Sequence, residues 1–395
     1  MTRLLLIAGG GIGGLAAALA SARAGWAVQV FERAAAFSEV GAGIQLGPNV
    51  VRVLQDWGLA PALQAVAAFP EQLRVREVAS GRTLGVLRLA DMPARYGAAY
   101  ATIHRADLLG LLHAAVQHQP GIALHLQTQV EGCTTTDDAV VARLQTGPDI
   151  RGDALVGADG LWSRVRASLL HDGPPRLTGH LAYRALLPQA SLPAALRSSE
   201  VTAWLGPQQH LISYPVRAGT ALNVVGFVHG STHSATPDAL AHWDHSANAA
   251  DLRAAFAGSC APLQDLLLAI DAWRLWVMCD RPPLQGAHQQ ALGRIALLGD
   301  AAHPMRPYLA QGAGMAIEDA QALGQALTPQ GDVAAALAIY AQQRWRRNAR
   351  VQAKAQRNGR VFHATGLVRL GRNAAMRLLG ERLLDMPWLY GARPG

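Results

Sequence analysis

Residues 298–320 combine a turn with a glycine-rich helix start, an arrangement suited to binding an anion. The segment reads LGDAAHPMRPYLAQGAGMAIEDA and follows a short apolar run that predicts a buried strand. Gly299 and Asp300 form the expected turn. A helix is expected to begin at three later residues, Gly312, Ala313 and Gly314. Backbone N–H groups at such a helix start have no partner within the helix, so they are free to meet a negatively charged ligand.

The N-terminus carries a second glycine motif, and its surroundings specify the ligand more closely. Gly9, Gly11 and Gly14 give G-x-G-x-x-G. The predicted order is strand, turn, helix, strand and acid, over residues 4–8, 9–14, 15–24, 27–31 and Glu32. The first glycine permits a tight turn, the second lets a pyrophosphate approach the backbone, and the third lets the helix pack on the strand. Glu32 lies at about the ~20-residue spacing of a ribose-binding acid, and Arg33 beside it joins the candidate site. The motif predicts a bound dinucleotide.

The composition fits a chain with a substantial core. Half of the residues are hydrophobic, so the chain can bury a substantial core. Its 395 residues are enough for two domains. Arg3 precedes an alanine-rich apolar stretch like that of a secretory signal, but glycines interrupt the stretch, and we expect no signal. No other segment has ~18 uninterrupted apolar residues, so we expect a cytoplasmic protein that does not enter a membrane. Three scattered cysteines without C-x-x-C spacing predict neither a disulfide framework nor a metal site.

The positive charge of the chain is concentrated near the C-terminus. The formal net charge is +8, and the segment from Arg344 to Arg377 holds ten basic residues and no acid. The rest of the chain therefore carries −2. Because the segment lacks a recognised nucleic-acid module or interleaved stacking aromatics, we expect no nucleic-acid partner. We interpret it as a solvated helix face that steers anionic ligands.

A third ligand-binding candidate and a β-rich region lie between the two glycine motifs. Residues 154–156 predict a buried strand, and Asp159-Gly160 follows it directly. An Asp-Gly pair alone is usually an ordinary turn, so its position among the other motifs is what makes it a candidate. Short β-type runs separated by Pro and Gly fill residues 178–276 and also 73–89. Together they predict a largely antiparallel sheet.

His210 and Tyr214 are the sharpest catalytic candidates on that sheet. They are four residues apart in HLISY, so on a strand both side chains point to the same face. Histidine titrates near neutral pH and can act as a base. Taken alone, the pair is better explained as a hydrogen-bonded core or surface histidine and a packed tyrosine.

Three segments taken together resemble a known family. Residues 9–32, 157–166 and 299–320 are similar, in this order, to the single-component flavin-dependent aromatic hydroxylases. Within that family, three further segments look most like the 3-hydroxybenzoate 6-hydroxylase, salicylate hydroxylase and 6-hydroxynicotinate monooxygenase branch: 41–49, 303–304 and 388–391. Many relatives have Gly where Ala310 stands, but Ala is found there in the 3-hydroxybenzoate branch.

The resemblance implies an α/β fold with a Rossmann-like FAD-binding domain, an inserted mostly antiparallel β-sheet substrate domain and C-terminal helices. The FAD-binding domain would be discontinuous and comprise residues 1–72, 100–177 and 277–332. The substrate domain would comprise 73–99 and 178–276, with a helical segment over 333–395.

The resemblance also assigns cofactor roles to individual residues. The N-terminal glycines and Glu32 would hold the ADP half of FAD, Arg105 would approach the flavin, and Asp300 would bind the ribityl chain. Asp159 would serve both FAD and nicotinamide binding. The helix from Gly312 would direct its positive end at the N1–C2 carbonyl edge of the flavin.

The reaction implied is hydroxylation of a small phenolic or hydroxypyridine carboxylate by O₂, with NADH or NADPH as co-substrate, through a flavin C4a-hydroperoxide. His210 would be the base that activates the ring hydroxyl, and Tyr214 would orient it. Tyr308 and Gln45 would line the pocket. The resemblance further implies a homodimer. The ring position and the choice between NADH and NADPH stay open.

Three other functions fit parts of the pattern. A non-oxygenating flavoprotein oxidase or reductase would keep the same FAD motifs, and so would a catalytically silent flavin-binding regulator. A flavin halogenase is disfavoured because that chemistry uses a positioned lysine, and the single lysine, Lys354, lies in the basic segment.

Overall fold

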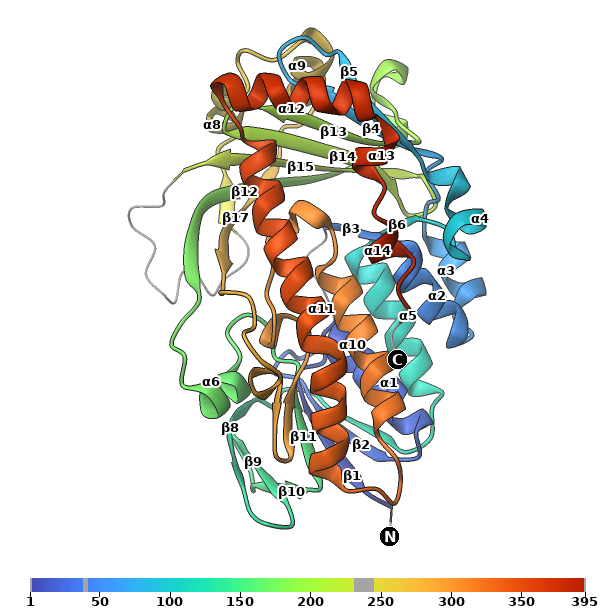
Figure 1. Ribbon diagram of the computed structural model, residues 1–395, viewed down its shortest axis with the longest axis vertical. Coiled ribbons are helices and arrows are strands. Elements are labelled where there is room, and N and C mark those ends of the chain that lie inside the picture. The colour runs from blue at the N-terminus through green and yellow to red at the C-terminus, as the bar shows by residue number, and fades with distance from the viewer. Residues whose placement is uncertain (1, 38–41, 231–244, 394–395) are drawn as a thin grey trace.

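The computed structural model of this chain describes residues 2–37, 42–230 and 245–393. Two sheets lie one above the other, and a long C-terminal helix runs between them (Figure 1). The lower sheet contains the N-terminal strand, and the upper sheet contains the β-rich region.

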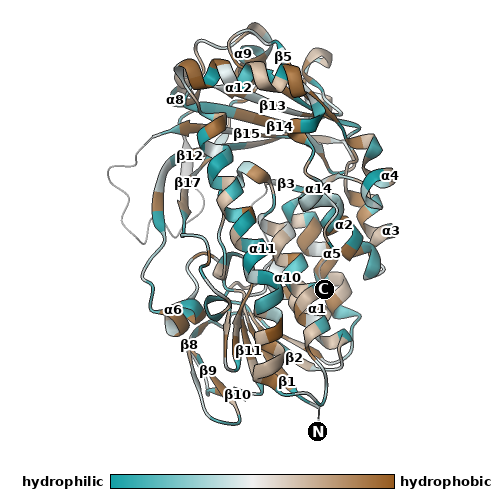
Figure 2. Ribbon diagram, viewed as in Figure 1, coloured by the Kyte–Doolittle hydropathy of each residue, from teal (hydrophilic) through white to brown (hydrophobic). Residues whose placement is uncertain are grey.

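Six strands form the lower sheet in the order β18-β19-β11-β1-β2-β7. They are β1 (Leu4–Ala8), β2 (Ala27–Phe31), β7 (Ile122–His125), β11 (Ala154–Gly157), β18 (Ala291–Leu292) and β19 (Ile295–Leu297). The central strand β1 pairs in parallel with β2 and with β11, and only the edge strand β18 runs antiparallel to its neighbour. A strand covered on both faces is a continuous apolar run, and Figure 2 shows the strands of this sheet in the hydrophobic colour.

Helices cover one face of this sheet and a small sheet covers the other. The helices are α1 (Ile12–Arg23), α5 (Arg105–Gln117) and α10 (Gly312–Ala326). The helices α1 and α10 pack so closely that a Cβ added at Gly324 would lie 2.9 Å from the carbonyl oxygen of Ala20. Opposite them lie β8 (Val130–Thr135), β9 (Val140–Leu144), β10 (Ile150–Gly152) and α6 (Arg164–Leu170). The expected Rossmann-like arrangement is confirmed.

The upper sheet has eight strands in the order β16-β17-β12-β15-β14-β13-β4-β5. They are β4 (Gln72–Glu77), β5 (Thr83–Arg88), β12 (Arg176–Pro188), β13 (Val201–Gly206), β14 (Gln209–Val216), β15 (Ala221–His229), β16 (His245–Ala247) and β17 (Trp273–Asp280). Every pairing is antiparallel except that of β13 with β4. The mostly antiparallel sheet is thus as expected, while the domain boundaries at 73, 99, 178 and 276 stay a prediction.

The two faces of the upper sheet have different coverings. The helices α8 (Ala249–Ala255) and α9 (Ala261–Leu268) pack on the outer face, where Leu211 and Leu222 point. The alternate residues of β14, His210, Ile212 and Tyr214, point to the opposite face. We call this the inner face, and it looks toward the lower layer.

Shorter elements connect the two layers. They are β3 (Gly43–Leu46), β6 (Ala101–His104), α2 (Pro48–Asp56), α3 (Ala60–Val66), α4 (Met92–Tyr96) and the 3-10 turns η1 (Leu89–Asp91), η2 (Gln189–Ser191), η3 (Ala194–Leu196), η4 (Ala287–Gln289), η5 (Gly299–Ala301) and η6 (Pro307–Leu309). The strands β3 and β6 form an antiparallel pair beside the inner face.

The C-terminal segment is helical, as expected. Its helices are α11 (Val333–Phe362), α12 (Gly366–Leu379), α13 (Glu381–Leu384) and α14 (Pro387–Tyr390). The 30-residue helix α11 begins at the Asp332 cap and carries the chain from the lower layer to the upper sheet (Figure 1). In the part of the chain that the structure describes, no helix is both long and apolar enough to cross a bilayer.

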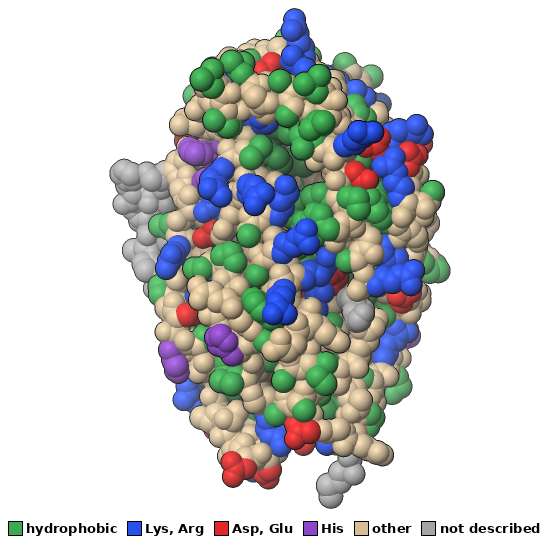
Figure 3. All heavy atoms as spheres, viewed as in Figure 1, with side chains coloured by type: hydrophobic (Ala, Val, Ile, Leu, Met, Phe, Trp, Pro, Cys, Tyr) green, Lys and Arg blue, Asp and Glu red, His purple; other side chains and the backbone are tan. Residues whose placement is uncertain are grey.

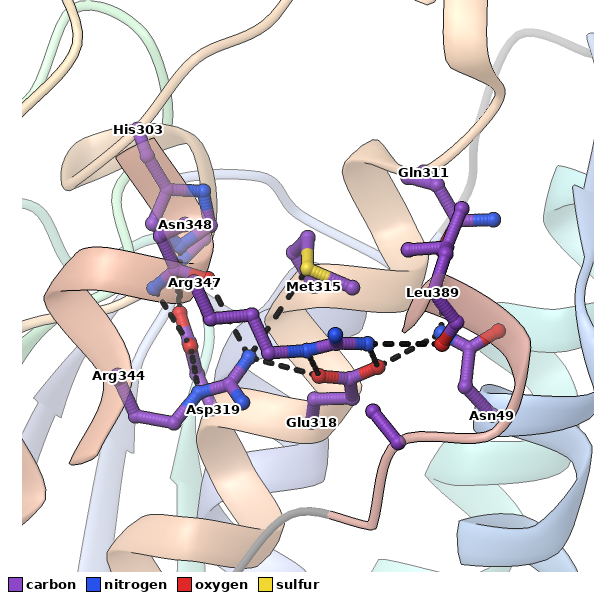
Figure 4. A network of polar contacts seen from close by, with 12 residues as sticks. Asn49, His303, Gln311, Met315, Glu318, Asp319, Arg344, Arg347, Asn348 and Leu389 are labelled. Carbon is purple, nitrogen blue, oxygen red and sulfur yellow. Dashed lines mark hydrogen bonds and ion pairs between the residues drawn. The ribbon is translucent and has the colours of Figure 1, made fainter. Parts of the chain in front are cut away.

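The expectation that the basic segment is a solvated face is wrong for three of its arginines. Arg344 is buried and pairs with Asp319 (Nε–Oδ1 2.8 Å) and Glu318 (2.9 Å), which α10 supplies. Arg347 donates two hydrogen bonds of 2.7 Å to Glu318 (Figure 4). Arg372 is buried as well and donates to backbone carbonyls and to an asparagine.

The remaining basic residues of the segment do reach solvent. Figure 3 shows Lys and Arg side chains following α11 across this face, with hydrophobic side chains above them over α12. Arg346, Arg350, Arg357 and Arg360 are exposed. The segment therefore joins α11 to α10 through its buried arginines and presents the others to water.

Candidate active site

The glycine turn after β1 is shaped by close backbone approach. Gly9 has φ +101°, and a Cβ there would lie 2.5 Å from the carbonyl oxygen of Ala158. A Cβ on Gly14 would lie 1.8 Å from the carbonyl oxygen of Gly9, so only glycine fits. Gly11, which caps α1, has no atom within 4 Å of its Cβ position. The turn therefore leaves open space directly in front of the N-terminus of α1, as a pyrophosphate requires.

Glu32 lies beside that turn. Its carboxylate accepts hydrogen bonds from the backbone N–H of Gly10 (2.7 Å) and of Ala34 (2.9 Å). These contacts hold a negative charge at the end of β2, next to the glycines, where a ribose would lie. Arg33 follows it with an exposed side chain.

Asp159 lies at the same edge of the lower sheet, after β11. Its Oδ2 accepts from the backbone N–H of Arg164 (2.7 Å) and Val165 (3.2 Å), while its Oδ1 is buried without a partner in the described chain. Burial raises the pKa of this carboxyl in spite of those hydrogen bonds. A buried, half-satisfied carboxylate beside Gly9 is suited to accept a hydrogen bond from a ligand.

Asp300 and Arg105 come together at the other end of the site. Asp300 lies in η5 after Gly299, which has φ +61°. Its side chain is exposed. Desolvation nevertheless raises the pKa of its carboxyl, and the positive charges of Arg105 and His303 oppose this rise. Arg105 begins α5, and its backbone N–H donates to Ala42 (2.8 Å).

The first turn of α10 is not capped by a side chain. Gln311 is the N-cap residue, but its Oε1 accepts from Asn49 Nδ2 (3.1 Å) rather than from the helix. The N–H groups of Gly312, Ala313 and Gly314 thus receive no side-chain acceptor from the cap. The positive end of α10 therefore carries no side-chain cap that would compete with an electron-rich ligand.

Tyr214 lies on the inner face, and Gln45 of β3 lies beside it. A Cβ on Gly43 would lie 2.5 Å from Tyr214 Cε2, so the ring packs directly on β3. Burial raises the pKa of the Tyr214 phenol, opposed by the nearby Arg184 and by Gln45. Tyr100 Oη donates to Gln45 Oε1 (2.6 Å), which orients this amide.

His210 is buried among aromatic rings on the same face. It stacks on Phe227 with centroids 4.4 Å apart and an 8° angle between planes, and Tyr308 meets it edge-on at 5.1 Å. Its Nδ1 lies 2.6 Å from Nε2 of His363, the residue that ends α11. Burial lowers the pKa of His210 far below its usual value, and His363 and His180 lower it further. The imidazole is therefore neutral and carries one lone pair, and its surroundings oppose a net positive charge on it.

Tyr308 belongs to the same aromatic cluster. Its Oη lies 2.5 Å from Nδ1 of His180 on β12, and burial raises the pKa of its phenol. The structure thus brings together three of the expected pocket residues, His210, Tyr214 and Tyr308, on or against the inner face.

Arg184 on β12 is a candidate that sequence reasoning missed. Its guanidinium carbon lies 3.4 Å from the centroid of the Trp276 ring, and its Nε is buried with no partner. Among the described residues the guanidinium makes no ion pair or hydrogen bond. Burial, with Arg105 nearby, lowers its pKa to about 9 although Tyr214 opposes this. An arginine in the otherwise apolar LAYRALL strand was the available signal.

Comparison with known proteins places the chain among flavoproteins. The family model described as "FAD binding domain" matches residues 2–358. A 3-hydroxybenzoate 6-hydroxylase from Polaromonas naphthalenivorans is 37% identical over 99% of this chain and 96% of its own length. A 6-hydroxynicotinate 3-monooxygenase from Bordetella bronchiseptica is 35% identical over 93% of each chain.

Solved structures agree with this placement. A salicylate hydroxylase in complex with substrate is 26% identical, with a TM-score of 0.83 over 100% of this chain and 96% of that one. HpxO of Klebsiella pneumoniae, complexed with FAD and uric acid, is 27% identical, with a TM-score of 0.84 over 96% and 94%.

Proposed function

Because this chain belongs to the FAD-binding family of aromatic hydroxylases, we propose that it uses NAD(P)H and O₂ to hydroxylate a small phenolic or hydroxypyridine carboxylate. It is an FAD-dependent monooxygenase by membership. The observation that carries the choice of substrate is Arg184, a guanidinium without a carboxylate partner in the described chain, on the sheet face that also carries His210 and Tyr214. A substrate carboxylate would supply the missing negative charge.

The residues described above fit FAD. The open space before Gly11 suits the pyrophosphate, and Glu32 lies where the ribose of the ADP half would be. The half-satisfied Asp159, together with Asp300 and Arg105, would hold the middle of the cofactor, and the uncapped start of α10 would meet the electron-rich edge of the flavin. When bound, FAD accepts reducing equivalents from NAD(P)H and activates O₂ for transfer to the ring.

The protein's own contribution would be to position and activate the ring. Arg184 would fix the carboxylate through charge-assisted hydrogen bonds. His210, neutral and without a described partner at Nε2, would accept the proton of the ring hydroxyl there, making the ring more electron-rich. Tyr214, with Gln45 beside it, would orient the hydroxyl. The surrounding rings of Phe227 and Tyr308 would exclude water.

The test is oxidation of NADH and of NADPH by the FAD-loaded protein with and without ring ligands, with the product followed by mass. Hydroxybenzoates and hydroxynicotinates should stimulate oxidation and gain one oxygen. Phenol and hydroxypyridine, which lack the carboxylate, are the matched controls and should stimulate weakly. Oxidation that no ring ligand stimulates would favour an oxidase or reductase, and equal stimulation by the controls would remove the carboxylate from the proposal.

We also propose a homodimer that works in the cytoplasm, where NAD(P)H is supplied. Large apolar side chains on α12 are exposed, among them Leu367 and Leu378 at 85% each. Exposed apolar patches of this kind are suited to a protein partner. Sedimentation of the FAD-loaded protein would test the assembly, and a monomer at micromolar concentration would contradict it.

A further inference from the structure

Three histidines connect the buried base to the surface. His210 Nδ1 lies 2.6 Å from His363 Nε2, and His363 Nδ1 lies 2.9 Å from His229 Nε2. The rings come from β14, from the residue that ends α11, and from the end of β15. Each contact uses a different nitrogen of His363, so this ring links the other two.

The solvent exposure of the three rings rises from His210 and His363 to His229. His210 and His363 are 4% and 5% exposed, whereas His229 is exposed to solvent. The Nε2 of His210 makes no hydrogen bond within the described residues. The chain of rings therefore has one free acceptor at its buried end and water at the other.

The surroundings keep the three rings neutral. Burial lowers the pKa of each of them, that of His363 to about 3. The charged groups that act on His363 are the cations Arg306 and Arg372, and the neighbouring ring of His180 stacks on it at 5.0 Å.

The other groups near the chain of rings add no counter-charge to it. Tyr308 faces His210 and shares its hydroxyl with His180. Two carboxylates lie beside the arginines that act on His363. Asp280 pairs with Arg306 at 2.6 Å, and Glu77, which acts on Arg372, accepts a hydrogen bond from Asn373 (2.8 Å). A proton is thus not stabilised on any one ring, and a neutral imidazole has one N–H and one lone pair to pass it on.

We propose that His210, His363 and His229 form a proton relay that carries the proton of the ring hydroxyl from the active site to solvent. The relay rests on the proposed role of His210 as base. The ring hydroxyl gives its proton to His210 Nε2, and the Nδ1 proton of His210 passes to His363 Nε2. The Nδ1 proton of His363 passes to His229 Nε2, and the Nδ1 proton of His229 leaves to water. One proton enters and one leaves, and each ring ends as its other tautomer.

The relay returns to its starting state during the reaction. After oxygen has been added, the ring carbon loses a proton and the ring oxygen regains one as aromaticity is restored. A proton that enters through His229 and moves inward restores all three tautomers. The relay therefore serves a full turnover without a ring flip.

Two of these rings, together with His180, offer a metal site as the competing explanation. Ligand atoms of His180, His229 and His363 lie within 4.8 Å of one another. Two imidazole ligands at ~2.0–2.1 Å from a tetrahedral zinc ion lie roughly 3.3 Å apart. The 2.9 Å separation of His363 and His229 is a hydrogen-bond distance instead.

The test measures proton release when FAD-loaded enzyme binds a hydroxylated ring carboxylate, with a pH indicator and stopped-flow mixing. His363→Phe should slow phenolate formation and proton release about ten-fold or more and should abolish their solvent isotope effect. Binding of benzoate, which has no hydroxyl, should change less than about two-fold. His118→Gln, at the exposed histidine that caps the C-terminus of α5, is the control and should behave as wild type.

Other outcomes distinguish failure of the relay from failure of His210 as the base. Unchanged release in His363→Phe would overturn the relay, and if that variant fails to fold, His229→Gln gives the same test at the solvent end. Normal phenolate formation in His210→Gln would instead remove the base on which the relay rests. A change in wild-type release on adding EDTA would overturn the relay in favour of a metal.

Discussion

Replacing Arg184 with glutamine should separate binding of the carboxylate from stability of the protein. The guanidinium stacks on Trp276 at 3.4 Å and makes no described ion pair. A hydrogen bond to a charged partner contributes about 1.5–3 kcal/mol, which corresponds to roughly 10- to 150-fold in Kd. We therefore expect Arg184→Gln to weaken benzoate by that factor and to leave phenol within about two-fold.

The thermal stability of Arg184→Gln should stay equal or increase, whereas its affinity for benzoate should fall. Burial lowers the pKa of Arg184 to about 9, so folding disfavours its charged form, and this cost is present at every pH below about 9. The difference from 12.5 corresponds to roughly 5 kcal/mol at most, and the partial exposure of the side chain and the lost stack on Trp276 reduce the gain to about 1 kcal/mol. The Tm of the variant should stay equal or rise by about 1–3 °C.

The assay is titration of the FAD-loaded protein with benzoate and phenol, followed by the flavin absorbance, beside a thermal melt. Arg76→Gln is the matched control, because Arg76 also stacks on a tryptophan, Trp204 at 5.2 Å, but on the outer face. Equal losses for benzoate and phenol, or a lowered Tm with unchanged benzoate affinity, would show that Arg184 is structural and would refute the reasoning.

Three further perturbations test other parts of the structure. Gly11→Ala should keep the fold, because its φ is −71° and its Cβ would meet no atom within 4 Å, but should lose FAD on gel filtration; full retention would contradict the cofactor assignment. Ala310→Gly should raise the free energy of unfolding in urea by up to about 1 kcal/mol, because Ala310 has φ +52°; a clear loss would show that this backbone is not strained. Burial opposes ionisation of Asp319, but His303 and Arg344 outweigh it and lower its pKa to about 2, so its contribution is present above about pH 4 and is lost as the pH falls toward 2. Asp319→Asn should therefore flatten the decline of Tm over that window, and an unchanged profile would contradict the assignment.

The sequence predicted the elements that local patterns encode. The glycines of residues 9–14 need particular backbone space, and the apolar runs around them are strands buried on both faces, so the first strand, helix and second strand of the lower layer followed from spacing, while the rest of that layer followed from the family resemblance. The alternation in HLISY placed His210 and Tyr214 on one face. These features depend on neighbours within a few residues.

Contacts between segments that are distant in the sequence could not be predicted from it. The basic segment was interpreted as solvated because the carboxylates that neutralise Arg344 and Arg347 lie on α10, 25 to 29 residues earlier, and the pairing depends on how two helices pack. The histidine chain has the same origin, since His210, His229 and His363 come from three elements that only the folded chain brings together.

The arginines of this chain divide according to what neutralises them. Arg344 is buried, but Asp319 and Glu318 meet it, and Arg372 is buried with carbonyl oxygens as acceptors. Removing either should cost stability, because polar partners are left unsatisfied in the interior. Arg184 is partly exposed, but its Nε is buried against a tryptophan face with no described acceptor. Since a buried donor without a partner is costly, its presence on the same sheet face as His210 and Tyr214 is best explained by a ligand that brings the acceptor, and an anionic ring is the ligand that all three residues fit.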